Sequence, residues 1–170
     1  MDAEELRTLQ APIKALYRED AGAARVTLSV SGEVGEGLTC SVDTARALVE
    51  AGLHPKAGGD GTAACSGNML LEALVACAGV TLKAVATALG IEIRTGTVTA
   101  EGDLDFRGTL GVEKSAPVGF SEVRLRLEVQ SDAAPETLER LLKLTERYCV
   151  IYQTLASPPR LSAALEVRPG

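Results

Sequence analysis

The sequence predicts an α+β fold, with helices gathered on one side of a mostly antiparallel sheet. The apolar segment from Asn68 to Leu89 predicts a long helix, and Gly90 is a residue type that commonly ends one. Ser121 to Val129 alternates apolar and charged residues, as a strand with one solvated face does. The 170 residues are expected to form one domain, residues 1–170, in which residues 1–20 are an N-terminal helical extension.

The N-terminal extension is expected to begin with a capping box formed by Asp2 and Glu5. Apolar residues follow at helical spacing, and Pro12 is expected to bend or shorten this helix. The alternating segment Arg25–Val34 then predicts a strand, and Leu38–Val42 predicts its return after a glycine turn.

The middle of the chain contains a predicted short helix, a loop and a strand. Asp43 is a suitable cap for a short helix through Val49, and residues 55–68 have the composition of a loop. After the long helix, Ile91–Glu101 predicts a strand. The glycine-containing segment Asp103–Gly119 then predicts a bent hairpin arm.

The last predicted helix begins at Pro135, with Ser131 or Asp132 as its cap. Its apolar stripe ends at Cys149. Two consecutive prolines then interrupt the chain before a final predicted strand, Leu161–Val167. The element order is therefore helix, strands, helix, strands, helix, strand.

Composition argues against a nucleic-acid partner and a membrane span. The net charge is −6 and aromatic residues make up 3% of the chain, so phosphate attraction and base stacking are both poorly supported. The apolar run Met69–Leu89 has a membrane-spanning length, but Glu72 and Lys83 lie within it, which favours a core helix. The acidic N-terminal sequence lacks the pattern of a secretory signal, so we expect a cytoplasmic, reducing environment.

The chain has four cysteines, Cys40, Cys65, Cys77 and Cys149, and one histidine, His54. No pair has the short spacing typical of a zinc site, and the single histidine weakens a Cys–His mechanism. The cysteine at 77 lies among small residues on the long helix, and the one at 149 lies on an apolar helical stripe. Residue types alone leave two interpretations open for these two: inert buried side chains or a reactive pair.

Three segments resemble the family of osmotically induced protein C and organic hydroperoxide resistance proteins (OsmC/Ohr). Leu70–Thr81 is similar to the family's central helix with its Ala-Cys, and Thr145–Val150 is similar to the segment of its second cysteine. Gly119–Val123, which opens the alternating strand, also resembles the family pattern. The similarity extends from about Gly58 to Val167. It implies mostly antiparallel sheets around long central helices in an intertwined homodimer, with two sites at the subunit interface.

The resemblance implies a function in the oxidative stress response. Cys77 would be the peroxidatic cysteine of a thiol peroxidase for organic hydroperoxides and hydrogen peroxide, and Cys149 would be the resolving cysteine. Attack on the peroxide would leave a sulfenic acid on Cys77, followed by a Cys77–Cys149 disulfide. A dithiol reductant, either a lipoylated protein or a thioredoxin-type donor, would reopen it. No metal or organic cofactor is expected.

The sequence departs from the family at one acidic position. The resemblance places a Glu ten residues before the first cysteine, where this chain has Gly67. Asp60 and Glu72 are possible substitutes. Glu72 is five residues from Cys77, about 140° around the helix, so we expect it to face another chain or solvent. The family's activating Arg has two candidates, Arg25 and Arg46, of which Arg46 is preferred because it precedes the loop that leads to the site.

Two further questions stay open at this stage. Cys65 is not expected from the family pattern, and it is either a spare loop thiol or a third redox sulfur that reacts with Cys77 or Cys149. Cys40, in an apolar strand, is expected in the core.

The missing carboxylate also leaves an alternative function, a non-peroxidase protein that senses redox state or binds a small ligand in the same apolar pocket.

Overall fold

A computed structural model describes the chain continuously over residues 48–111 and 114–168. Before residue 48 it describes residues 2–5, 7, 8, 11, 15, 19, 32–34 and 39–43. The predicted Arg25–Val34 and Leu38–Val42 strands are therefore seen only in part, and the candidates Arg25 and Arg46 lie outside the described residues.

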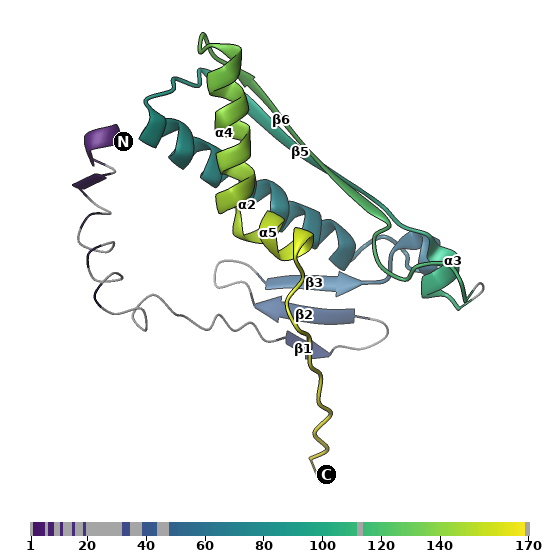
Figure 1. The fold of residues 1–170 in the computed structure, drawn as a ribbon. Coiled ribbons are helices and arrows are strands. Elements are labelled where there is room, and N and C mark those ends of the chain that lie inside the picture. The colour runs from purple at the N-terminus through teal and green to yellow at the C-terminus, as the bar shows by residue number, and fades with distance from the viewer. Residues whose placement is uncertain are drawn as a thin grey trace.

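The described strands form two sheets (Figure 1). The four-stranded sheet has the order β1 (Gly32–Val34), β2 (Thr39–Asp43), β3 (Leu48–Gly52) and β4 (Ala64–Cys65). Its pairs are antiparallel except the short parallel pair of β3 and β4. The second sheet is a long antiparallel ribbon of two strands, β5 (Thr95–Asp103) and β6 (Glu122–Gln130).

The longest described helix is the central element α2 (Ser66–Leu89). In Figure 1, α4 (Pro135–Tyr148) and α5 (Val150–Ala156) run across α2, which also packs against β5. Two further short elements are η1 (Pro55–Ala57) and α3 (Phe106–Thr109), of which α3 lies in the predicted hairpin arm between β5 and β6, and the described residues 3–5, 7, 8, 11, 15 and 19 are also helical. The mixed α+β class is thus confirmed.

Among the described residues, the core consists of two clusters along α2. One cluster joins Leu82 and Ala86 of α2 to Ile91 and to Leu141 of α4. The other joins Leu74 and Ala78 of α2 to Cys149. The two alanines are fully buried, and their small side chains allow the crossing helices to approach α2 closely.

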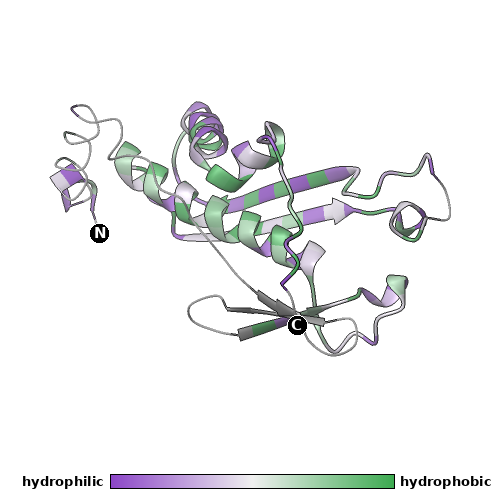
Figure 2. Cartoon of the chain, turned by 90° about the horizontal axis from the view of Figure 1, so that it is seen from below, coloured by the Kyte–Doolittle hydropathy of each residue, from purple (hydrophilic) through white to green (hydrophobic). Residues whose placement is uncertain are grey.

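Three local sequence predictions are confirmed. Gly90 ends α2 in the left-handed conformation at φ 69°. Along β6, exposed residues alternate with half-buried ones, and Figure 2 shows the matching alternation of hydropathy. The capping box is also present, since the Glu5 N–H donates to Asp2 Oδ1 (2.8 Å) and the Asp2 N–H donates to Glu5 Oε2 (2.9 Å).

The predicted short helix from Asp43 to Val49 is wrong at its described residues. Asp43 belongs to β2, and Val49 belongs to β3, where it pairs with Val42. Strand pairing between β-branched residues outweighs a local capping signal here, as tertiary context often does.

The predicted cap of α4 is also wrong, since Ala134 takes the N-cap position. Ser131 and Asp132 bond to the loop between α2 and β5 instead. The Ser131 hydroxyl donates to the Glu92 carbonyl (2.6 Å), and Arg94 Nη2 donates to Asp132 Oδ1 (2.9 Å). Both polar side chains thus connect the start of α4 to the turn after α2.

The predicted final strand, Leu161–Val167, is extended but unpaired in the described chain, so this prediction is wrong for the single chain. A strand needs a neighbour for its backbone hydrogen bonds, and this segment leads away from the helices in Figure 1. Leu161, Leu165 and Val167 are consequently 90%, 91% and 84% exposed.

The apolar surface of α2 is not fully covered by the described part of the chain. It has 24 residues and contains an 18-residue window with a mean hydropathy of 1.8, so it is long and apolar enough to cross a membrane, and it is largely hydrophobic in Figure 2. Its contacts with α4, α5 and β5 instead make it the central helix of the fold. Part of its surface remains open, since Val80 is 74% exposed.

Candidate active site

Cys77 and Cys149 lie together in one of the two core clusters, with Leu74 and Ala78. Cys77 is on α2 and is partly exposed, whereas Cys149 is fully buried between α4 and α5. Both carry free thiols. The fold therefore brings into one cluster two cysteines that are 72 residues apart in the sequence.

Cys149 forms the break between α4 and α5. Its backbone leaves the helical region (φ −73°, ψ 109°), so it ends one helix and begins the next. The Cys149 N–H donates to the Thr145 carbonyl (2.9 Å), and the Cys149 carbonyl accepts from the Gln153 N–H (2.9 Å). At such a break, the first N–H groups of the second helix have no partner within that helix and can face another group.

The first N–H groups of α5 face the sulfur of Cys77. Burial raises the pKa of the Cys77 thiol, but hydrogen bonds from the Ile151 N–H, the Cys149 thiol, the Val150 N–H and the Thr81 hydroxyl together outweigh it. The pKa of Cys77 therefore lies below its ordinary value. A lowered pKa raises the fraction of thiolate, which is the nucleophilic form of cysteine.

Cys149 is shifted in the opposite direction. Burial raises the pKa of its thiol, and the neighbouring Cys77 raises it further, while the Tyr152 and Ile151 N–H groups offset only part of this. Cys149 therefore keeps its proton when Cys77 is a thiolate, and can donate it to that thiolate. The two cysteines are thus chemically distinct, with Cys77 the more nucleophilic.

Sequence reasoning missed one source of the Cys77 activation. The activating Arg implied by the resemblance stays a prediction, because Arg25 and Arg46 lie outside the described residues. The structure places the N-terminus of a different helix, α5, against the sulfur. Neither glycine nor proline marks the break at Cys149, so the sequence contains no local signal for it.

The substitutes considered for the missing carboxylate do not belong to the cysteine cluster. Asp60 is exposed and accepts hydrogen bonds from the N–H and hydroxyl of Thr62 (2.8 and 2.7 Å). Glu72 is exposed on α2, away from Cys77, as its position on the helix predicts.

Cys65 is the N-cap of α2, twelve residues before Cys77. This separation corresponds to about 18 Å along a helix, so Cys65 cannot contact Cys77 of the same chain. It lines a separate pocket of about 320 Å³ together with Phe106 and Phe120. Cys40 lies in β2 opposite Ala51, and the prediction for its side chain lies outside the described residues.

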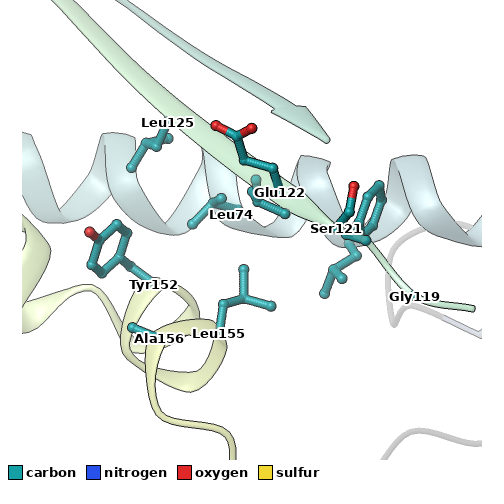
Figure 3. A pocket seen from close by; sticks show the side chains of 11 residues that line it. Leu74, Gly119, Ser121, Glu122, Leu125, Tyr152, Leu155 and Ala156 are labelled. Carbon is teal, nitrogen blue, oxygen red and sulfur yellow. The ribbon is translucent and has the colours of Figure 1, made fainter. Parts of the chain in front are cut away.

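An apolar pocket of about 530 Å³ adjoins the cysteine cluster. Figure 3 shows Tyr152 and Leu155 of α5 across this pocket from Leu74 of α2 and Leu125 of β6. Leu74, Leu125 and Tyr152 also belong to or pack on the cysteine cluster, so the pocket and the cluster share a wall. Neither cysteine lines the pocket itself. Among the described residues, no group of three His, Cys, Asp or Glu side chains is arranged to hold a metal ion.

Comparison with known proteins identifies the family. The family model described as OsmC-like protein matches residues 59–163, more than half of the chain. The chain belongs to the OsmC family. This confirms the resemblance found in its cysteine segments. None of the curated proteins compared with this OsmC-family chain matches its sequence.

Solved structures support the same fold at low sequence identity. An OsmC-like protein of Mycoplasma pneumoniae has a TM-score of 0.65 at 18% identity, over 78% of this chain and 89% of that one. An organic hydroperoxide resistance protein of Legionella pneumophila has a TM-score of 0.60 at 17% identity, over 78% and 93%. The organic hydroperoxide resistance protein OhrB of Bacillus subtilis has a TM-score of 0.54 at 19% identity, over 78% and 93%. This OsmC-family member is therefore divergent in sequence but not in fold.

The lowered pKa of Cys77 predicts its reactivity with pH. The alkylation rate of Cys77 by iodoacetamide should rise as the thiol loses its proton, with a midpoint below that of an ordinary free thiol. Besides Cys77, the titratable side chains in the cluster are Cys149 and Tyr152. The side chains of β5 and β6 that pack on the cluster are apolar. Peptide mass spectrometry at a series of pH values measures this midpoint. The same peptide in denatured protein should titrate as an ordinary thiol, and equal midpoints in the two states would contradict the prediction.

Proposed function

We propose that this protein is a cysteine-based thiol peroxidase that reduces organic hydroperoxides, and also hydrogen peroxide. The observation that carries the proposal is the asymmetric pair: Cys77 with a lowered pKa beside a buried Cys149 with a raised one. The similarity in fold to proteins named for organic hydroperoxide resistance supports the same chemistry.

The proposed reaction has two steps. The Cys77 thiolate attacks the terminal oxygen of the hydroperoxide, so that an S–O bond forms, the O–O bond breaks and the alkoxide leaves, taking a proton from solvent to become the alcohol. The Cys149 sulfur then attacks the sulfenic acid on Cys77, so that an S–S bond forms and water leaves. Two thiols are oxidised, and one hydroperoxide is reduced to an alcohol and water.

The disulfide must be reopened before the next cycle. A dithiol reductant does this by thiol–disulfide exchange, and a lipoylated protein or a thioredoxin-type donor supplies the required chemistry. The sulfur atoms carry the electrons, so the proposed cycle needs no metal or organic cofactor. We place the protein in the cytoplasm, where such reductants keep thiols reduced.

A turnover assay tests the proposal directly. Cumene hydroperoxide should be consumed continuously in the presence of dithiothreitol and catalytic amounts of the protein. Consumption no faster than with dithiothreitol alone would contradict a peroxidase function.

A second function, binding of a small apolar ligand without peroxide turnover, is favoured by one observation. The apolar pocket of about 530 Å³ shares a wall with the cysteine cluster but is not lined by either cysteine. A protein that binds an apolar fluorescent probe here, and shows no turnover in the assay above, would fit this alternative.

We further propose that the active form is a homodimer. A single chain leaves Val80 of the central helix and the alternating apolar residues Leu161, Leu165 and Val167 largely exposed. Exposed apolar surface commonly marks the sites at which proteins associate. A second copy that covers α2 and pairs with the C-terminal segment removes both from water.

The dimer proposal predicts a selective effect in the C-terminal segment. Leu165→Asp should weaken dimerisation at least about tenfold, because an apolar side chain worth about 2 kcal/mol on burial is replaced by a charge. Ser162→Asp, on the opposite side of the extended segment, should have a much smaller effect. Sedimentation at a series of protein concentrations measures both. Unchanged dimerisation in Leu165→Asp would show that this segment is not in the interface.

A further inference from the structure

The side chain of Gln153 bridges the break between α4 and α5. Gln153 belongs to α5, and its Nε2 donates to the backbone carbonyl of Glu146 in α4 (2.9 Å). In an uninterrupted helix, the Glu146 carbonyl would accept from the N–H of Val150, four residues later. The Gln153 amide therefore takes the place of a backbone donor.

Because the Gln153 amide occupies the Glu146 carbonyl, the Val150 N–H is free to interact with Cys77. The Val150 N–H, which a continuous helix would direct to Glu146, instead faces the Cys77 sulfur together with the Ile151 N–H. If α4 and α5 joined into one helix, both N–H groups would return to backbone carbonyls of α4. The interaction with Cys77 thus depends on the break staying open.

We propose that Gln153 is a positioning residue that holds the break at Cys149 open and keeps the first N–H groups of α5 directed at Cys77. The inference deepens the proposed peroxidase function and rests on it for its biological meaning. The side chain of Gln153 is not part of the core cluster and acts through the backbone of Glu146 and Val150, while its backbone N–H donates to the Cys149 carbonyl in every variant.

The backbone sequence between Glu146 and Gln153 does not by itself enforce the helix break. No glycine or proline lies between Glu146 and Gln153 to enforce a break, and isoleucine and valine are both compatible with a helix. Gln153 is itself exposed, so its replacement removes no core packing. An unsatisfied Glu146 carbonyl would favour the return of the Val150 N–H, because a free backbone acceptor readily takes an available donor.

Gln153→Met tests the proposal, because methionine has nearly the same length but no N–H donor. The readout is the pH midpoint of Cys77 alkylation by iodoacetamide, followed on the Cys77 peptide by mass spectrometry. We expect a higher midpoint and an alkylation rate at neutral pH that is lower by about twofold to tenfold, the effect of one net hydrogen bond. Gln153→Ala should give the same direction, and serves if the first variant folds poorly.

Thr154→Ala is the matched control. Its hydroxyl also donates to a backbone carbonyl, that of Val150 (2.8 Å), but it does not bridge the two helices. The control should leave the midpoint unchanged. An unchanged midpoint in both Gln153 variants, or an equal shift in Thr154→Ala, would overturn the proposal. Alkylation needs no peroxide, so the role of Gln153 stands or falls separately from the turnover assay.

Discussion

Replacing Cys77 with serine is expected to reduce cumene hydroperoxide consumption to the background rate, a loss of at least about a thousandfold, since the variant lacks the nucleophile. Of the two core cysteines, Cys77 is partly exposed and Cys149 is buried, and the first N–H groups of α5 are directed at the Cys77 sulfur. A serine hydroxyl keeps the size of the side chain but is not ionised at neutral pH. The comparison is made at equal protein concentration with dithiothreitol as reductant.

Cys65→Ser is the control for this loss. Cys65 lies in a different pocket, about 18 Å along α2 from Cys77, so its removal should leave turnover nearly unchanged. A comparable loss in both variants would support a third redox sulfur, with Cys65 reaching the site from a second chain. Full activity in Cys77→Ser would remove the proposed mechanism.

Replacing Cys149 with serine is expected to separate the two chemical steps. The first step, oxidation of Cys77, should still occur, because the thiolate and the α5 backbone remain. The second step should not, so each Cys77 reduces one peroxide and then stays as a sulfenic acid. Trapping with dimedone and mass spectrometry should therefore label Cys77 strongly in the variant and weakly in the wild-type protein.

Steady-state turnover of Cys149→Ser should fall to the slow rate at which dithiothreitol reduces the sulfenic acid directly. Because Cys149 is fully buried, Cys149→Ala serves as a second variant that avoids burying a hydroxyl. Equal dimedone labelling in variant and wild type would mean that Cys149 does not resolve the sulfenic acid.

Position 67, where the resemblance places a Glu and this chain has Gly67, is far from Cys77 within one chain. Ten residues of helix separate Gly67 from Cys77 by about 15 Å, so a carboxylate at this position could not contact Cys77 of the same chain. A Cβ added at Gly67 would lie 3.4 Å from Cζ of Phe120, an ordinary van der Waals contact, so the position lies beside Phe120 and not beside Cys77. Within one chain, the N–H groups of α5 stabilise the thiolate without a carboxylate.

The sequence predicted those elements whose signals are local. The left-handed Gly90 ended α2 as expected, and the strict alternation of β6 identified both the strand and its solvated face. Cys77 and Cys149 were singled out because their segments resemble a known family.

Features decided by distant contacts were not predicted. Val49 lies in a strand because it pairs with Val42, although the preceding Asp43 is a good helix cap. The break at Cys149 has no glycine or proline to announce it, so the activation of Cys77 by α5 became visible only in three dimensions. The segment Leu161–Val167 has the pattern of a strand, yet the described chain offers it no partner.

The central claim, that Cys77 and Cys149 form a redox pair, is tested most directly by mapping disulfides after peroxide treatment. Protein treated with one equivalent of cumene hydroperoxide is alkylated, digested without reduction and analysed by mass spectrometry. The account predicts one dominant cross-linked product, which joins the Cys77 and Cys149 peptides and disappears after dithiothreitol. A product that joins Cys77 to Cys65, or two unlinked and alkylated thiols at Cys77 and Cys149, would contradict it.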